Sequence, residues 1–182
     1  LAQRKLSKSF YGILAYTWVR SEFRNKYDNY APSAWDNGHI ISLTGGLKLK
    51  NDWEIGMKFR FAGGSPYTPY DYATSSLIQV WDANSFGVFD YDNLNNGRLK
   101  SNHGLDLRVD KKWFWKKVAL NLYMDIQNLY NFQAETQRSL IANQDANGNL
   151  LIDPNDPTRY SLKYISNVSG TVLPSIGLQF EF

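Results

Sequence analysis

The chain has 182 residues, no cysteine and a formal net charge of +3 at pH 7, which excludes disulfide frameworks and thiolate metal sites and suits one domain. Its basic residues are spread along the chain and form no concentrated basic face, which argues against nucleic-acid binding. No apolar run reaches the roughly 20 residues that a membrane-spanning helix needs, so a membrane role would require strands.

The chain opens with Leu1 and shows no signal peptide. We therefore expect a mature form or a fragment of a longer protein.

Alternation of apolar and polar residues predicts about six long strands. The first, near residues 9–23, is apolar on both faces, so the sequence does not orient it. The later strands each carry an apolar series at every second position. These series are Ile41, Leu43, Leu47 and Leu49; Trp53, Ile55, Met57, Phe59 and Phe61; Leu105, Leu107 and Val109; Val118, Leu120, Leu122, Met124 and Ile126; and Ile176, Leu178, Phe180 and Phe182.

The lengths of strands and connections predict a membrane β-barrel. A nine-residue strand rises about 30 Å, and when tilted it covers close to the ~25 Å apolar band of an outer-membrane barrel. Tight links lie at Ser7–Lys8, at 51–52 and at 113–117, and long connections span 24–37, 62–101 and 129–170. Outer-membrane barrels have short periplasmic turns and long external loops. The predicted fold is therefore all-β, an antiparallel transmembrane β-barrel of which residues 1–182 supply about six C-terminal strands.

Aromatic and charged residues are sorted between the two strand ends. We expect Trp53, Trp113, Phe114 and Trp115 at the short-turn interface, and Phe61, Tyr130 and Phe132 at the far one. Most carboxylates fall in the long connections, whereas many cations fall near short turns. A basic rim that meets anionic headgroups is one hypothesis, and ordinary turn solubility is the other. These cations are Arg4, Lys5, Lys8, Lys48, Lys50, Lys111, Lys112, Lys116 and Lys117.

Charged residues that alternate with the apolar rows are expected to face the barrel lumen. We expect them to pair with one another or with a plug, or to line a substrate path. Six strands cannot close a membrane barrel, so further strands of the same polypeptide or other subunits are required. The lumen-facing candidates are Lys58, Arg60, Asp106, Arg108, Asp110, Asp125 and Glu181.

Several stretches resemble the C-terminal barrel of TonB-dependent outer-membrane receptors. They are Trp35–His39, Phe61–Tyr70, Leu105–Lys111, Asp125–Asn131 and Ile176–Phe182. The resemblance implies a barrel of about 22 strands with an N-terminal plug, which imports a siderophore, a glycan or a similar nutrient across the Gram-negative outer membrane. Residues 1–182 would be the C-terminal part of the barrel, without the plug or the segment that contacts TonB.

The resemblance also implies partners. They are outer-membrane lipid, the remaining strands and plug of the same receptor, TonB through the missing N-terminal part, the barrel-assembly machinery and a surface lipoprotein. Phe180 and Phe182 would form the assembly signal, because a terminal strand with alternate aromatic residues can add to another sheet; the alternative is that Phe182 is one more lipid-facing residue.

No catalytic constellation and no cofactor motif is recognisable, so we do not expect an enzyme. His39 and His103 are expected to make interface hydrogen bonds. Residues 145–156 faintly resemble a calcium loop, although Asn147–Gly148 is also a strong hairpin-turn signal.

The 62–101 connection offers exposed aromatic residues as ligand contacts, or it packs on itself. The ligand-contact candidates are Tyr67, Tyr70, Tyr72, Trp81, Phe86, Phe89 and Tyr91.

Two alternatives stay open. One is an outer-membrane barrel without TonB coupling, such as a pore, an adhesin or an assembly component. The other is a soluble, aromatic-rich β-sandwich that binds a ligand, in which the apolar rows would pack against a second sheet.

Overall fold

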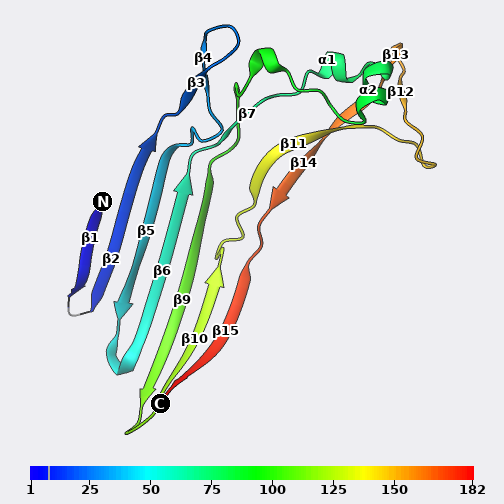
Figure 1. The fold of residues 1–182 in the computed structure, drawn as a ribbon. Helices are drawn as coiled ribbons and strands as arrows, with labels where there is room; N and C mark the ends of the chain where they lie inside the picture. The colour runs from blue at the N-terminus through cyan, green and yellow to red at the C-terminus, as the bar shows by residue number, and fades with distance from the viewer. Residues whose placement is uncertain (8) are drawn as a thin grey trace.

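A long sheet of seven antiparallel strands forms the body of the molecule (Figure 1). The computed structural model describes residues 1–7 and 9–182, so Lys8 in the first predicted turn lies outside the described residues. The strands run in the order β1, β2, β5, β6, β9, β10, β15. Their bounds are Ala2–Ser7, Phe10–Val19, Gly38–Lys48, Trp53–Ala62, Asn102–Phe114, Ala119–Gln127 and Leu173–Glu181.

The six predicted strands are confirmed in their positions, and β1 is an additional strand at the sheet edge. The register orients the first predicted strand, which the sequence left open. Leu14 of β2 pairs with Leu43 of β5, and Tyr16 pairs with Ile41. Because directly paired residues share a face, Phe10, Leu14 and Tyr16 join the apolar face.

The register divides the sheet into an apolar face and a polar face. One apolar row passes from Leu43 through Phe59 to Leu105 across three strands. Another joins Val109, Met124 and Ile176. The period-two patterns therefore align across strands, as a sheet with two different surroundings requires.

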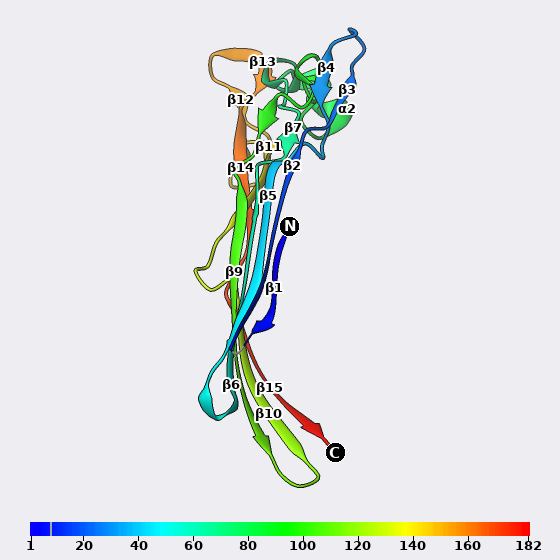
Figure 2. The same cartoon turned by 90° about the vertical axis from the view of Figure 1, so that its left-hand side faces the viewer.

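In the part of the chain that the structure describes, no second layer covers the apolar face. Seen from the side, the sheet is one thin, twisted layer (Figure 2). Ile176 is 74% exposed and Phe180 is 61% exposed. The other sheets described are two-stranded and lie in the long connections. The β-sandwich alternative would need a second sheet over these apolar rows, and the described residues place none there.

The connections alternate between short and long as predicted. The β1–β2, β5–β6 and β9–β10 links are short and lie at one end of the sheet, where the C-terminus also lies (Figure 1). The β5–β6 link is the 3-10 turn η1 (Lys50–Asp52), in which Asn51 has a φ of 57°.

The sheet is open, with β1 and β15 as its edges. Among the described residues, no helix is both long and apolar enough to cross a membrane.

The three long connections fold into a structured cap at the other end of the sheet. The 63–101 and 128–172 connections share a core of Trp81, Leu140, Ala142 and Leu162. A β3–β4 hairpin extends the connection between β2 and β5. The cap elements are β3 (Glu22–Arg24), β4 (Tyr30–Pro32), β7 (Pro66–Tyr67), α1 (Tyr72–Ser75), α2 (Ile78–Asn84), η2 (Tyr91–Asn93), β8 (Gly97–Arg98), β11 (Ala134–Ala142), β12 (Ile152–Asp153), β13 (Asp156–Tyr160) and β14 (Leu162–Ser169).

Candidate functional site: the polar face and the cap

The predicted lumen-facing residues all lie on the polar face. Lys58 is directly opposite Asp106, and Arg108 is directly opposite Asp125. Glu181 occupies the same face at the end of β15, opposite Ala119. The sequence pattern therefore placed these charges on one surface of the sheet.

Two ion pairs anchor this polar face. Arg60 donates to Asp106 across 3.1 Å, and Asp106 also accepts the backbone N–H of Asn128 at 3.0 Å. Asp106 thus fixes the point where β10 ends and the connection into the cap begins. Pairing of this kind compensates the two charges on the polar face.

Arg108 and Asp110 form the second pair along β9. Arg108 donates two hydrogen bonds of 2.8 Å to the two oxygens of Asp110. Asn121 adds a third donor to Asp110 at 3.1 Å. The guanidinium also lies 4.0 Å from the centre of the Tyr123 ring. This bidentate and stacked geometry is specific to arginine.

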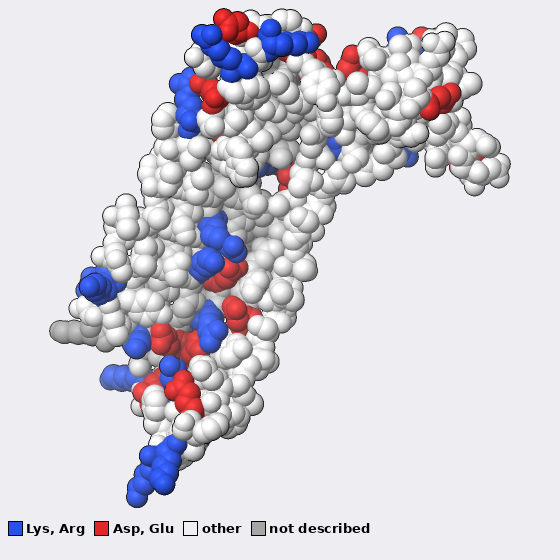
Figure 3. All heavy atoms as spheres, in the orientation of Figure 1, with Lys and Arg blue, Asp and Glu red and all other residues white. Residues whose placement is uncertain are grey.

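The charges of the polar face are balanced. Figure 3 shows basic and acidic side chains interleaved along the sheet. On the six strands from β2 to β15 the registers place five basic and five acidic residues on this face. They are Lys48, Lys58, Arg60, Arg108 and Lys112, and Glu54, Asp106, Asp110, Asp125 and Glu181.

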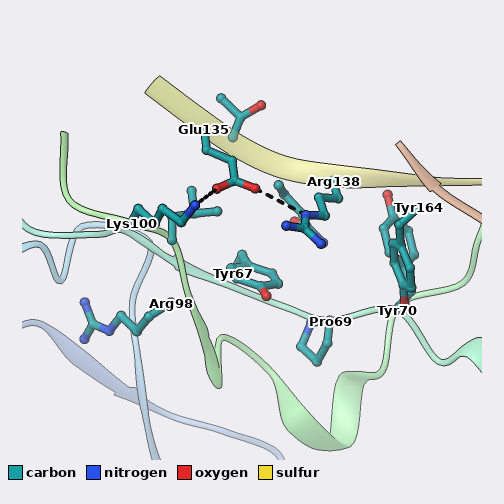
Figure 4. Close-up of a pocket in the computed structure, with 11 residues that line it drawn as sticks. Tyr67, Pro69, Tyr70, Arg98, Lys100, Glu135, Arg138 and Tyr164 are labelled. Atoms are coloured by element: carbon teal, nitrogen blue, oxygen red, sulfur yellow. Dashed lines mark hydrogen bonds and ion pairs between the residues drawn. The ribbon is translucent and has the colours of Figure 1, made fainter. Parts of the chain in front are cut away.

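The cap contains a cavity of about 400 Å³. The rings of Tyr67, Tyr70 and Tyr164 line it, and Tyr70 and Tyr164 lie side by side (Figure 4). Such rings offer flat faces on which sugar or aromatic rings can stack. The cavity draws on both long connections, so it exists only when the cap is folded.

Glu135 holds two cations at the rim of this cavity. Its carboxylate accepts from Lys100 at 3.1 Å and from Arg138 at 3.2 Å (Figure 4). Hydrogen bonds from Lys100 and then from Arg138 lower the pKa of Glu135 below its ordinary value. The two cations are therefore held near the tyrosines, where they can donate to acceptor oxygens of a ligand.

The structure separates the predicted aromatic ligand contacts into different groups. Tyr67 and Tyr70 line the main cavity, and Tyr67, Phe89 and Tyr91 line a second one of about 340 Å³. Tyr72 and Phe86 are exposed at the cap surface.

Trp81 requires a correction. It is 7% exposed and packs in the cap core with Leu140, Ala142 and Leu162. A ligand cannot reach its indole in this arrangement, so Trp81 is a core residue. The sequence alone did not distinguish an aromatic loop residue that is open to a ligand from one that packs in the protein core.

Nine of the eleven cavity residues were not among the sequence candidates, and Lys100, Glu135, Arg138 and Tyr164 are four of these nine. They come from segments far apart in the chain. No local pattern distinguishes them from other loop residues.

Each histidine shares a hydrogen bond with a tyrosine hydroxyl. His39 Nδ1 shares a hydrogen bond of 2.9 Å with the Tyr16 hydroxyl, and His103 Nδ1 shares one of 2.7 Å with the Tyr130 hydroxyl. Both pairs lie toward the cap end of the apolar face, since His39 is opposite Trp18 and His103 is opposite Phe61.

The stretch that resembled a calcium loop is a hairpin turn. Asp145 accepts from the backbone N–H groups of Asn147 and Asn149 at 2.8 Å each. The Asn149 side chain donates to its other oxygen at 2.9 Å, and Gly148 has a φ of +86°. These bonds lower the pKa of Asp145, the Asn149 side chain contributing most. In the described part of the chain, no three acidic or histidine side chains are grouped to hold a metal ion.

Comparison of the chain with protein-family models, with curated proteins and with solved structures gave no match.

Proposed function

We propose that this chain is part of the wall of a β-barrel in the outer membrane of a Gram-negative bacterium. In this proposal it supplies C-terminal strands of a TonB-dependent receptor that imports a nutrient such as a siderophore or a glycan. The observation that carries the proposal is a single-layer sheet with one uncovered apolar face and one charge-balanced face.

The apolar face favours acyl chains as its surroundings. Large side chains such as Leu178 and Phe180 are exposed over the length of the strands. Water makes such a continuous apolar surface unfavourable at roughly 25 cal/mol per Å². Contact with lipid removes that cost. In lipid, however, the edge strands β1 and β15 must pair with further strands, because unpaired backbone groups cost several kcal/mol each there.

The cap and the polar face favour a transport role. The cap lies at the long-connection end, which is the external side in outer-membrane barrels. A ligand held at Tyr67, Tyr70 and Tyr164 would then lie above the charged wall. The specific assignment to a TonB-dependent receptor rests on the sequence resemblance.

A nitroxide scan of β6 tests the membrane proposal. Residues 1–182 contain no cysteine, so Met57→Cys and Lys58→Cys each place one thiol in this region. In the full polypeptide, reconstituted in lipid vesicles, the label at position 57 should collide more with oxygen than with a water-soluble nickel complex. The label at position 58 should show no such preference for oxygen. Equal accessibility at both positions, or nickel contact at position 57, would overturn the proposal.

Ion conductance separates the receptor from the non-TonB pore. A plug within the barrel, as the resemblance implies, should leave the full polypeptide nearly closed to potassium chloride in a planar bilayer. A steady open channel would favour the pore instead.

A further inference from the structure

The two ends of the sheet differ in how their cations are compensated. At the cap end, seven cations form ion pairs with carboxylates: Arg20, Arg24, Lys26, Arg98, Lys100, Arg138 and Arg159. At the short-turn end, the described cations form no ion pair. Lys48 and Lys112 belong to the polar face. We call the other six the basic rim: Arg4, Lys5, Lys50, Lys111, Lys116 and Lys117.

Lys111 occupies a special position within the basic rim. It is the one charged residue that the registers place on the apolar face of the six strands from β2 to β15. Its ammonium lies 5.7 Å from the Trp53 ring centre and 5.4 Å from the Trp113 ring centre. It also donates to the backbone oxygen of Asn51. An ammonium has three N–H donors, so two stay available for another acceptor.

The β9–β10 turn combines cations with exposed aromatic rings. Trp113, Phe114 and Trp115 stand between Lys111–Lys112 and Lys116–Lys117, and all three rings are exposed. Turn solubility explains the lysines but not three exposed aromatic residues among them. Aromatic rings beside lysines suit the boundary between acyl chains and headgroups, where rings and ammonium groups both find partners.

We propose that the basic rim binds anionic phospholipid headgroups, with the Lys111 ammonium, between Trp53 and Trp113, donating to the lipid phosphate. Lys116 and Lys117 extend this site beyond the sheet end, where they attract the negative surface of the leaflet. The inference rests on the proposed membrane location and adds the lipid class that the short-turn end selects. Charge complementarity identifies the occupant, since uncompensated lysines favour an anionic headgroup over a zwitterionic one.

The test measures which lipids surround the full polypeptide. The polypeptide is reconstituted in phosphatidylcholine vesicles that contain either spin-labelled phosphatidylglycerol or spin-labelled phosphatidylcholine. The fraction of each labelled lipid that is bound to the protein is then compared. Wild type should enrich phosphatidylglycerol, and 1 M salt should reduce the enrichment. K116Q/K117Q and K111Q should each lower it, by up to about five-fold per lysine if each contributes ~1 kcal/mol near the surface. K26Q/K163Q removes two positive charges at the cap end and should leave it unchanged.

The outcomes separate the inference from the proposed function. If the label at position 57 shows water contact, the membrane proposal fails and the lipid site fails with it. If the protein inserts but binds both lipids equally, only the lipid site is overturned. An equal loss in K26Q/K163Q also overturns it, because net charge and not the basic rim would then control the preference.

Discussion

Arg159 donates a hydrogen bond of 2.6 Å to the hydroxyl of Ser76, a residue that is 2% exposed and lies 83 positions away in the chain. The same guanidinium also donates to the backbone oxygen of Ala73. The backbone N–H of Tyr160 donates to the Ser76 carbonyl at 2.7 Å. These bonds join β13 to the segment between α1 and α2, so the two longest connections fold as one unit.

Replacing Arg159 by alanine should loosen the cap without affecting the sheet. The loss of hydrogen bonds to partly buried groups is expected to cost about 1–3 kcal/mol. Hydrogen exchange should then speed up at residues 72–84 and stay unchanged in β5 and β6. Arg138→Ala is the matched control, since the Arg138 side chain is 57% exposed and the ion pair of so exposed a side chain is worth at most about 1 kcal/mol. Equal protection in both variants would show that Arg159 does not hold the cap.

Trp81→Ala should destabilise the cap much more than Tyr91→Ala. The indole of Trp81 fills the cap core, and emptying such a site costs about 3–5 kcal/mol. Tyr91 is 61% exposed, so its loss should stay within about 0.5 kcal/mol. Limited proteolysis of the long connections measures the difference. If Trp81→Ala resists protease as wild type does, the packing described for the core is wrong.

Asp71 should make the stability of α1 depend on pH. It caps the helix by accepting from the Thr74 backbone N–H at 2.9 Å and from the Thr74 hydroxyl. These bonds, led by the hydroxyl, lower the pKa of Asp71. Folding thus favours the ionised carboxyl, and its contribution is present above the unfolded pKa of about 3.9 and is lost as pH falls through the lower folded value.

The expected cost of Asp71→Ala is about 1 kcal/mol at neutral pH, and it should shrink in acid. Opening free energies of the α1 amides, taken from hydrogen exchange, provide the measurement. Asp71→Asn keeps an acceptor oxygen that does not titrate. The difference in opening free energy between the Asp71→Asn and Asp71→Ala variants should therefore not change with pH. A constant cost for Asp71→Ala down to pH 2 would contradict the assignment.

Gly177 on the polar face should not tolerate a side chain. A Cβ there would lie 2.3 Å from the Tyr123 hydroxyl oxygen, so the ring that stacks on Arg108 must move. Gly177→Ala should cost about 1–3 kcal/mol, measured by urea unfolding in vesicles. Gly104 occupies the same face with nothing within 4 Å of its Cβ position. Gly104→Ala should be neutral or slightly stabilising, and equal costs for the two would refute the steric argument.

The strands were predictable because their pattern is local. In the series from Trp53 to Phe61, each residue alternates with a polar or small one, and this needs no knowledge of distant residues. The polar face followed from the same rule, which placed Lys58, Arg108 and Asp125 on one surface. β1 was missed because Ala2–Ser7 carries no apolar alternation, and its pairing with β2 alone defines it.

The cap was not predictable, because its contacts are between distant segments. Trp81 and Tyr91 occupy the same connection and look alike as loop aromatics, yet one packs against Leu140 and the other is exposed. Likewise, Tyr164 gains its place beside Tyr70 only when two long connections fold together. A local sequence pattern does not encode tertiary packing of this kind.

The equal numbers of basic and acidic groups on the polar face of the six strands from β2 to β15 have a consequence for any solute that travels beside that face. On this face a basic side chain lies opposite an acidic one on the neighbouring strand, as Lys58 does with Asp106. The two charges largely cancel at a distance, so no long-range field would trap or repel an ion that moves along the face. Such a path would sort its cargo by shape and by hydrogen bonds, and the sign of the cargo's charge would matter little.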